Sequence, residues 1–244
     1  MIDALTMTQA GMTNDMQRLQ VISNNLANVG TLGFKKDVGV VRPFQAYVAD
    51  GLSPSVRDGV SVPGPEFTRM TDFSGGTLKY TGNPLDFGIE GGGFLVVSTP
   101  TGEAFTRQGN MRLDETGRLV TGAGYPVLGN GGEIRLSTST PRVDEAGTVW
   151  EGNVAVAQLK LVKIAQPETL LRSGEGLYEA SANTDVLPAD GLRLRQGYAE
   201  TANVVTMHEM IKLIETVRHF DTSQRLVRGY DDMLDRAINV AGEL

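Results

Sequence analysis

Few residues in this 244-residue chain have the type and spacing needed for chemistry. The two histidines, His208 and His219, are eleven residues apart. On an α-helix this separation is about 16 Å, too far for both to bind one metal ion. The chain has no cysteine, which excludes disulfides and thiolate metal ligands. The spacing therefore predicts two surface histidines rather than a metal site.

The other candidates for catalysis have simpler structural interpretations. Residues 91–93 (GGG) precede a strand-like run and do not link a strand to a helix, so they are not a dinucleotide-binding loop. Asp86 and Glu90 lack the aromatic-rich surroundings expected of a glycosidase pair. The acidic turns at 114–115 and 144–145 lack the alternating oxygen ligands of an EF-hand. The sequence also has no serine elbow, P-loop or HExxH motif. It predicts neither an enzyme nor a cofactor.

Composition narrows the class further. The net charge of −7 argues against a nucleic-acid-binding protein, which usually has a basic face. No apolar run approaches the eighteen residues of a membrane span. The first residues lack the basic and apolar regions of a secretory signal. Taken alone, these features predict a cytoplasmic protein. The 30 glycines predict a β-rich middle with many tight turns.

The elements that position any functional surface are expected at the two ends of the chain. In the C-terminal part, apolar residues recur every seven positions, with two more beside them at helical spacing. Residues 206–209 (TMHE) have the pattern of a capping box. About 36 residues of helix would reach roughly 54 Å, longer than a compact domain requires. The stripe consists of Leu213, Phe220, Val227 and Leu234, with Met210 and Val217 beside them.

The N-terminal part carries a matching stripe on a helix expected over residues 3–28. Its members are Leu5, Met12, Leu19 and Leu26. Two interpretations remain open. Both stripes can pack into the core of one globule, which is the fate of most amphipathic helices. Alternatively, they form a coiled-coil layer that neighbouring copies complete.

Turns and short strands are expected between the helices. Asn28 to Gly33 should stop the first helix in a sharp turn, with Phe34 as an apolar anchor. Residues 93–97 should form a buried strand, and 154–163 one longer strand. Shorter strands are expected at 103–107, 110–113 and 118–121. A repeat, residues 112–120 (RLDETGRLV) and 142–150 (RVDEAGTVW), predicts two hairpins with glycine at positive φ.

The predicted fold is therefore α+β. Long N- and C-terminal helices pair as a coiled-coil layer, and the central domain is antiparallel and β-rich. The expected boundaries are 1–34 for the N-terminal helix and turn, 35–71 for an extended connecting segment, 72–195 for the β-rich domain and 196–244 for the C-terminal helix.

Three groups of motifs resemble the bacterial flagellar rod and hook proteins. The first is residues 23–29 (SNNLANV) followed by 33–35 (GFK), which is similar to the family's N-terminal signature. Residues 81–86, 89–94 and 105–110 resemble its β domain. Residues between Gln196 and Phe220 resemble its C-terminal signature. The likeness extends over nearly the whole chain. Within the family, the length and residues 159–163 are most similar to proximal rod proteins, with distal rod proteins as the alternative.

The resemblance implies a structural subunit. Such proteins leave the cell through the flagellar export apparatus without a cleaved signal and polymerise in the periplasm with copies of themselves and other rod proteins. No cofactor, nucleic acid or membrane span is implied. Charged residues such as Arg107, Arg112 and Arg118 are expected on outer faces. The residues expected at the assembly interface are Leu5, Met12, Leu19, Asn24, Asn25, Leu26, Asn28, Phe34, Met210, Leu213, Val217, Phe220, Val227 and Leu234.

Two other classes compete with a rod subunit. An extracellular binding module or adhesin would use the β domain, but it would give the matching terminal stripes no common purpose. An enzyme ranks last, because no catalytic group was found. Deletion of residues 1–28 distinguishes the first two: a binding module should keep its ligand, and a rod subunit should lose assembly.

Overall fold

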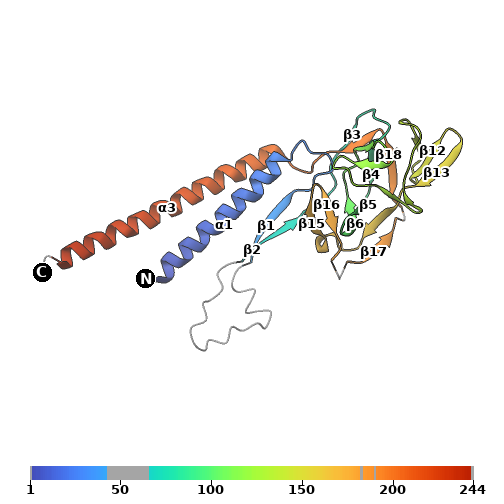
Figure 1. Cartoon of the computed structure of the whole chain (residues 1–244). Helices are drawn as coiled ribbons and strands as arrows, with labels where there is room; N and C mark the ends of the chain where they lie inside the picture. The colour runs from blue at the N-terminus through green and yellow to red at the C-terminus, as the bar shows by residue number, and fades with distance from the viewer. Residues whose placement is uncertain (1, 43–65, 182–183, 190, 243–244) are drawn as a thin grey trace. The chain divides into compact units, whose positions relative to one another are not determined.

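A computed structural model describes the chain except for residues 1, 43–65, 182–183, 190 and 243–244 (Figure 1). Long helices occupy the two ends of the sequence, and an antiparallel β-rich region lies between them in sequence, so the α+β class is confirmed. The chain divides into two compact units. Unit 1 comprises residues 1–27, 37–70 and 205–244, and unit 2 comprises residues 28–36 and 71–204.

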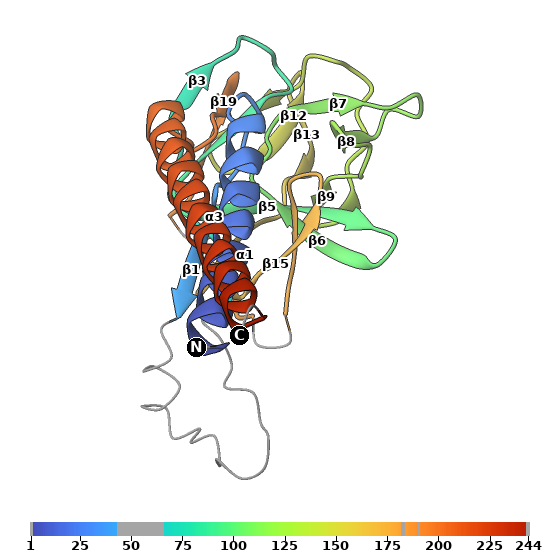
Figure 2. The same cartoon turned by 90° about the vertical axis from the view of Figure 1, so that its left-hand side faces the viewer.

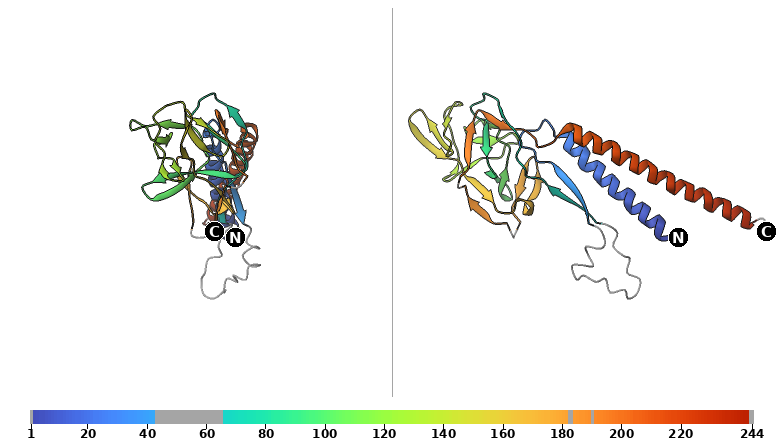
Figure 3. Two further views of the ribbon diagram at one scale, coloured as in Figure 1. Left: turned by 90° about the vertical axis from the view of Figure 1, so that its right-hand side faces the viewer. Right: turned by 180° about the vertical axis from the view of Figure 1, so that it is seen from behind.

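Unit 1 is built on two antiparallel helices, α1 (Ile2–Ala27) and α3 (Thr206–Gly242). They lie side by side in Figures 1 and 2 and in the right panel of Figure 3. Asn25 of α1 contacts Glu209 of α3, and Asp15 contacts His219. A step of ten residues back along α1 therefore matches a step of ten forward along α3, about 15 Å in each helix. This equal spacing defines a single antiparallel register.

The helix boundaries agree closely with the sequence pattern. α1 begins and ends within one residue of the expected range, and α3 has 37 residues where about 36 were expected. One detail of the capping pattern was not anticipated. The carboxylate of Glu209 is buried and accepts hydrogen bonds from Asn25 and Lys212. The helix start was predicted correctly, but this contact with the other helix was not.

Unit 1 also holds a two-stranded sheet of β1 (Asp37–Arg42) and β2 (Glu66–Thr71). Both strands fall within the expected connecting segment, whose residues 43–65 lie outside the described part of the chain. Among the described helices, none is both long enough and apolar enough to span a membrane.

Unit 2 is organised around a six-stranded sheet of order β15-β16-β6-β5-β14-β17, in which all neighbours are antiparallel. Its strands are β5 (Gly93–Thr99), β6 (Gly102–Thr106), β14 (Leu161–Ile164), β15 (Leu171–Gly174), β16 (Leu177–Glu179) and β17 (Val186–Pro188). A short 3₁₀ helix, η1 (Pro167–Thr169), precedes β15.

Smaller antiparallel sheets complete unit 2. They pair β3 with β19, β4 with β18, β7 with β8, β9 with β10, and β11 with β12 and β13. The strands are β3 (Leu78–Tyr80), β4 (Phe87–Glu90), β7 (Met111–Leu113), β8 (Leu119–Thr121), β9 (Leu128–Gly129), β10 (Gly132–Glu133), β11 (Arg142–Val143), β12 (Thr148–Glu151), β13 (Val154–Gln158), β18 (Arg193–Gln196) and β19 (Tyr198–Glu200).

The core of unit 2 lies on both faces of strand β5. Leu95 and Val97 belong to one cluster of buried apolar side chains, and Phe94 and Val96 belong to another. Successive side chains of a strand point to opposite faces, so a run of apolar residues is needed where both faces are covered. The predicted buried strand at 93–97 is confirmed.

The repeated sequence forms the two expected hairpins, β7–β8 and β11–β12. In each turn, the glycine N–H donates to the carbonyl of the aspartate three residues earlier, at 3.0 Å. Gly117 and Gly147 have φ values of +75° and +83°. Glycine reaches this region without the steric penalty of a side chain, which explains its place in both copies.

The expected single strand over residues 154–163 is wrong. β13 pairs with β12 in the three-stranded sheet, whereas β14 pairs with β5 and β17 in the six-stranded sheet. Leu159 and Lys160 connect them, and their N–H groups donate to Gly147 and Leu128. The alternating apolar residues predicted one strand, but Val154 and Val156 lie on an exposed face and do not continue the buried face of β14. A period of two shows that two faces exist, but not where the chain passes from one sheet to another.

Candidate assembly site

One face of α3 is covered, and it carries part of the predicted stripe. Leu213, Phe220 and Val227 are half-buried. They alternate at steps of three and four with three buried polar residues, Glu209, Thr216 and Ser223. This face meets α1, because Glu209 bonds Asn25.

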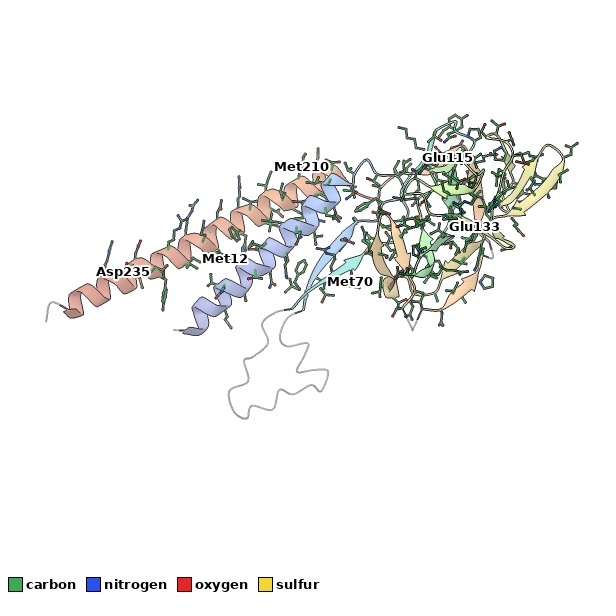
Figure 4. The ribbon with its side chains drawn as sticks, viewed as in Figure 1. Met12, Met70, Glu115, Glu133, Met210 and Asp235 are labelled. Carbon is green, nitrogen blue, oxygen red and sulfur yellow. The ribbon has the colours of Figure 1, made fainter. Side chains whose placement is uncertain are left out.

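The two flanking members of the stripe lie elsewhere on α3. Met210 and Val217 are 52% and 41% exposed, so these two members of the stripe are uncovered in the single chain. Figure 4 labels Met210 on α3. A helix turns 100° per residue, which places both residues about a quarter-turn from the covered face. They form a second, uncovered stripe with exposed Met207, Ile211 and Ile214.

On α1 the predicted residues lie mostly toward the covered side. Met12, Leu19, Leu26 and Asn24 are half-buried. Leu5 lies on α1 and Leu234 on α3, but their side chains are outside the described set. Asp15 is 4% exposed and contacts His219 on α3. The contact between the helices therefore contains polar groups as well as apolar ones.

Asn25 is the best-connected residue of this contact and is 1% exposed. Its side-chain N–H₂ donates to the carbonyl of Asp37 at 2.8 Å and to Glu209 at 3.2 Å. Its side-chain oxygen accepts from the N–H of Asp37 at 2.9 Å. Asn25 therefore ties the first residue of β1 and the first turn of α3 to α1. An amide suits this position because it both donates and accepts.

In unit 2, the residues that follow α1 end in a buried ionic cluster. Lys35 has no exposed surface, and its Nζ donates to Glu200 at 2.7 Å and to the carbonyl of Ser74 at 2.7 Å. The other carboxylate oxygen of Glu200 accepts from Nε of Arg107 at 2.9 Å. Burial lowers the pKa of Lys35, and the hydrogen bond with Glu200 opposes this shift. One carboxylate thus joins two buried cations.

Gly33 and Phe34 fit the same cluster. Gly33 has φ +68°, and a Cβ there would lie 2.5 Å from the carbonyl oxygen of Arg107. Its N–H donates to the carbonyl of Glu200 at 2.7 Å. Phe34 is buried, and the guanidinium of Arg172 lies 5.0 Å from its ring centre.

Asn28 begins the expected turn between α1 and Gly33. Its carbonyl accepts from the N–H of Thr31 at 3.0 Å, and its side chain accepts from the Thr31 hydroxyl at 3.2 Å. The turn and the Phe34 anchor are both confirmed.

Sequence reasoning missed the partners in the ionic cluster. Arg107 was expected on an outer face but is 5% exposed, so that expectation is wrong. Glu200 was not singled out at all. No local signal marks these two residues, since Lys35 is followed by Lys36 and Asp37, and Glu200 lies between Ala199 and Thr201. The described residues contain no group of three acidic or histidine side chains arranged to hold a metal ion.

Comparison with known proteins assigns the class. Residues 7–35 match the model described as "Flagella basal body rod protein". Residues 88–151 match "Flagellar hook protein FlgE/F/G D1 domain", and residues 195–240 match "Flagellar basal body rod FlgEFG protein C-terminal". The three matches cover α1 with its turn, much of the β-rich unit, and α3.

Individual relatives match over nearly the whole chain. The rod protein FlgG of Bacillus subtilis is 32% identical, covering 95% of this chain and 96% of its own length. FlgF of Caulobacter vibrioides is 33% identical, covering 93% of both chains, and FlgF of Salmonella typhimurium is 32% identical, covering 89% of both. The chain belongs to the family of flagellar basal-body rod proteins, which are structural proteins and not enzymes.

Proposed function

We propose that this chain polymerises in the flagellar rod through α1 and α3, which form an inner coiled-coil layer with the β-rich unit outside. One observation carries the proposal. Among the described buried hydrophobic residues, Val21 and Ile22 alone belong to the two helices, and the others lie in unit 2. Isolated helices depend on packing for most of their stability. A helix pair without a core of its own needs neighbours.

The uncovered stripe of α3 supports the same conclusion. Met207, Met210, Ile211, Ile214 and Val217 are each more than 40% exposed on about three turns of helix. Exposed apolar stripes of this kind mark interaction surfaces. The predicted interface residues Leu213, Phe220 and Val227 would close the pair, and the uncovered stripe would meet a neighbour.

Within the family, the proposal is a proximal rod subunit similar to FlgF, with a distal, FlgG-like subunit as the second candidate. Identity does not separate them, since relatives of both kinds are about equally similar. The modest length of 244 residues supports the FlgF-like role.

The proposed partners are other copies of the chain, other rod proteins and, during secretion, the flagellar export apparatus. The proposed location is the periplasmic part of the basal body, reached without a cleaved signal. The proposed layers are residues 1–34 and 196–244 inside and 72–195 outside, with 35–71 between them.

Deletion of the chromosomal gene tests the function. Basal bodies imaged from the deletion strain should lack a complete rod, and the full-length gene should restore both rod and motility. A gene lacking residues 1–28 should produce the β-rich unit without restoring either. Complete rods in the deletion strain would contradict the proposal. Loss of the proximal part would favour the FlgF-like role, and loss of the distal part alone would favour the FlgG-like role.

A further inference from the structure

The side of α1 that faces away from α3 has an unusual composition for an exposed helix. Its residues recur at steps of three and four, opposite the buried Asp15, Ile22 and Asn25. All are exposed and none is charged. They are Gln9, Thr13, Met16, Gln20, Ser23 and Ala27, here called the neutral face.

α3 has the opposite character outside its apolar stripe. Its exposed residues include Lys212, Glu215, Arg218, Asp221 and Arg225. A helix surface that remains in water usually carries such charges. The neutral face of α1 and the apolar stripe of α3 are therefore two exceptional surfaces on the helix pair, and both lack charge.

We infer that the neutral face of one copy packs against the apolar stripe of a second copy. This inference rests on the proposed function and names the partner of its interface. Neither surface carries a charged group that would lose its hydration when the two helices pack. The desolvation of charged groups is a large cost of burial. Met16 is 61% exposed near the middle of the neutral face, and its flexible side chain suits contact with Ile214 and Met210. The amide and hydroxyl groups beside it can bond to each other or to the rim of the stripe.

The pairing also has the symmetry that a rod requires. Contact between two different surfaces of the same chain is heterologous, so each copy leaves one surface free for the next. Contact of a surface with itself would close after two copies. A helical polymer needs the first kind.

The absence of cysteine permits a direct test with single-cysteine variants. Met16→Cys and Ile214→Cys would be placed on separate full-length chains, expressed together, and oxidised in isolated basal bodies. Any disulfide between them must join two copies. The matched control replaces Ile214→Cys with Glu215→Cys, an exposed neighbour on another side of the same turn. A second pair, Gln20→Cys with Met210→Cys, covers the failure of one variant to fold.

A cross-linked species of two chains is expected from both test pairs and should be lost with Glu215→Cys. The inference is overturned if the variants are present in basal bodies but neither test pair cross-links, or if Met16→Cys cross-links to itself with equal yield. In those cases the proposed function stands. If the chain is absent from basal bodies, both fail. Cross-linking restricted to the test pairs supports the inference.

Discussion

Gly30 and Gly33 lie three residues apart in the turn after α1, but only one has room for a side chain. A Cβ on Gly30 would meet no atom within 4 Å, whereas a Cβ on Gly33 would lie 2.7 Å from the Cα of Gln108. Gly33 also has a positive φ. The two positions are therefore a matched pair for testing how closely the backbone at Gly33 packs against the backbone of residues 107 and 108.

Gly33→Ala is expected to lower the free energy of unfolding of the β-rich unit by more than about 1–3 kcal/mol, because strained backbone and steric overlap act together. Gly30→Ala should leave it unchanged or raise it by up to about 1 kcal/mol. Urea unfolding followed by the fluorescence of Trp150, the only tryptophan, measures both. An equal change in the free energy of unfolding at the two positions would show that the close packing at Gly33 does not restrict the side chain there.

Glu200→Gln is expected to be more damaging than the loss of a surface ion pair. The variant would leave the buried Lys35 and Arg107 without their shared carboxylate. Breaking a buried pair from one side costs about 3–5 kcal/mol. Glu103→Gln removes the partly exposed pair with Lys160 and should cost less than about 1 kcal/mol. The same urea titration measures both variants. If Glu200→Gln lowers the free energy of unfolding no more than Glu103→Gln does, the expectation is refuted.

Residue-scale prediction from sequence succeeded for local chemistry and failed for distant partners. The turn from Asn28 to Gly33 could be predicted because asparagine and glycine favour such backbone angles themselves. The ion pair of Lys35 with Glu200 joins residues 165 positions apart, and the bond of Asn25 to Glu209 spans 184. A single sequence carries no direct signal for pairing over such separations.

At the scale of elements, the seven-residue series was informative but incomplete. It located both helices, and Leu213, Phe220 and Val227 do lie on the covered face. The series did not predict that Met210 and Val217 would be uncovered while their neighbours are covered. On a helix with 3.6 residues per turn, all of these residues belong to one broad apolar arc. The polar residues at the same spacing, such as Thr216 and Ser223, could not be recognised as buried from the pattern.

The two aspartate turns predict acid sensitivity of the β-rich unit. Partial burial alone would raise the pKa of Asp114, but hydrogen bonds from Arg118 and Thr116 outweigh it and hold this pKa below its usual value. For Asp144, burial likewise acts upward, and hydrogen bonds from Thr148, Trp150 and Ala146 lower the pKa overall. A carboxylate of this kind stabilises the fold fully above the unfolded pKa of about 3.9.

The free energy of unfolding should therefore fall as the pH drops below about 4 and these two groups take up protons. The double variant Asp114→Asn, Asp144→Asn should show a flatter dependence over the same range, whatever its stability at neutral pH. Urea titrations at stepped pH values measure the slope. If the free energy of unfolding of the double variant depends on pH as steeply as that of the original chain, these two turns do not cause the acid sensitivity.

For the whole molecule, the uneven distribution of buried apolar residues predicts uneven stability. In the free chain, we expect amide hydrogens of residues 5–26 and of α3 to exchange within seconds, while those of β5 and β6 stay protected. Ordering a residue costs about 1–2 kcal/mol of backbone entropy, and the helices bury few apolar groups to offset it. Exchange measured by mass spectrometry on monomer and on isolated rods tests this. Strong protection of residues 5–26 in the monomer would count against folding on assembly.

Within unit 2, the segment that follows α1 and the segment that leads into α3 are bonded directly to each other. Gly33 and Phe34 pair through their backbones with Glu200 and Asn203, and the Asn203 side chain accepts from Lys36. The distance between these two points is therefore set by a few hydrogen bonds and not by the length of chain between them. We expect that residues can be gained or lost at the tips of the intervening hairpins without changing the spacing of the two attachment points, so that chains of different lengths keep the same distance between their terminal segments.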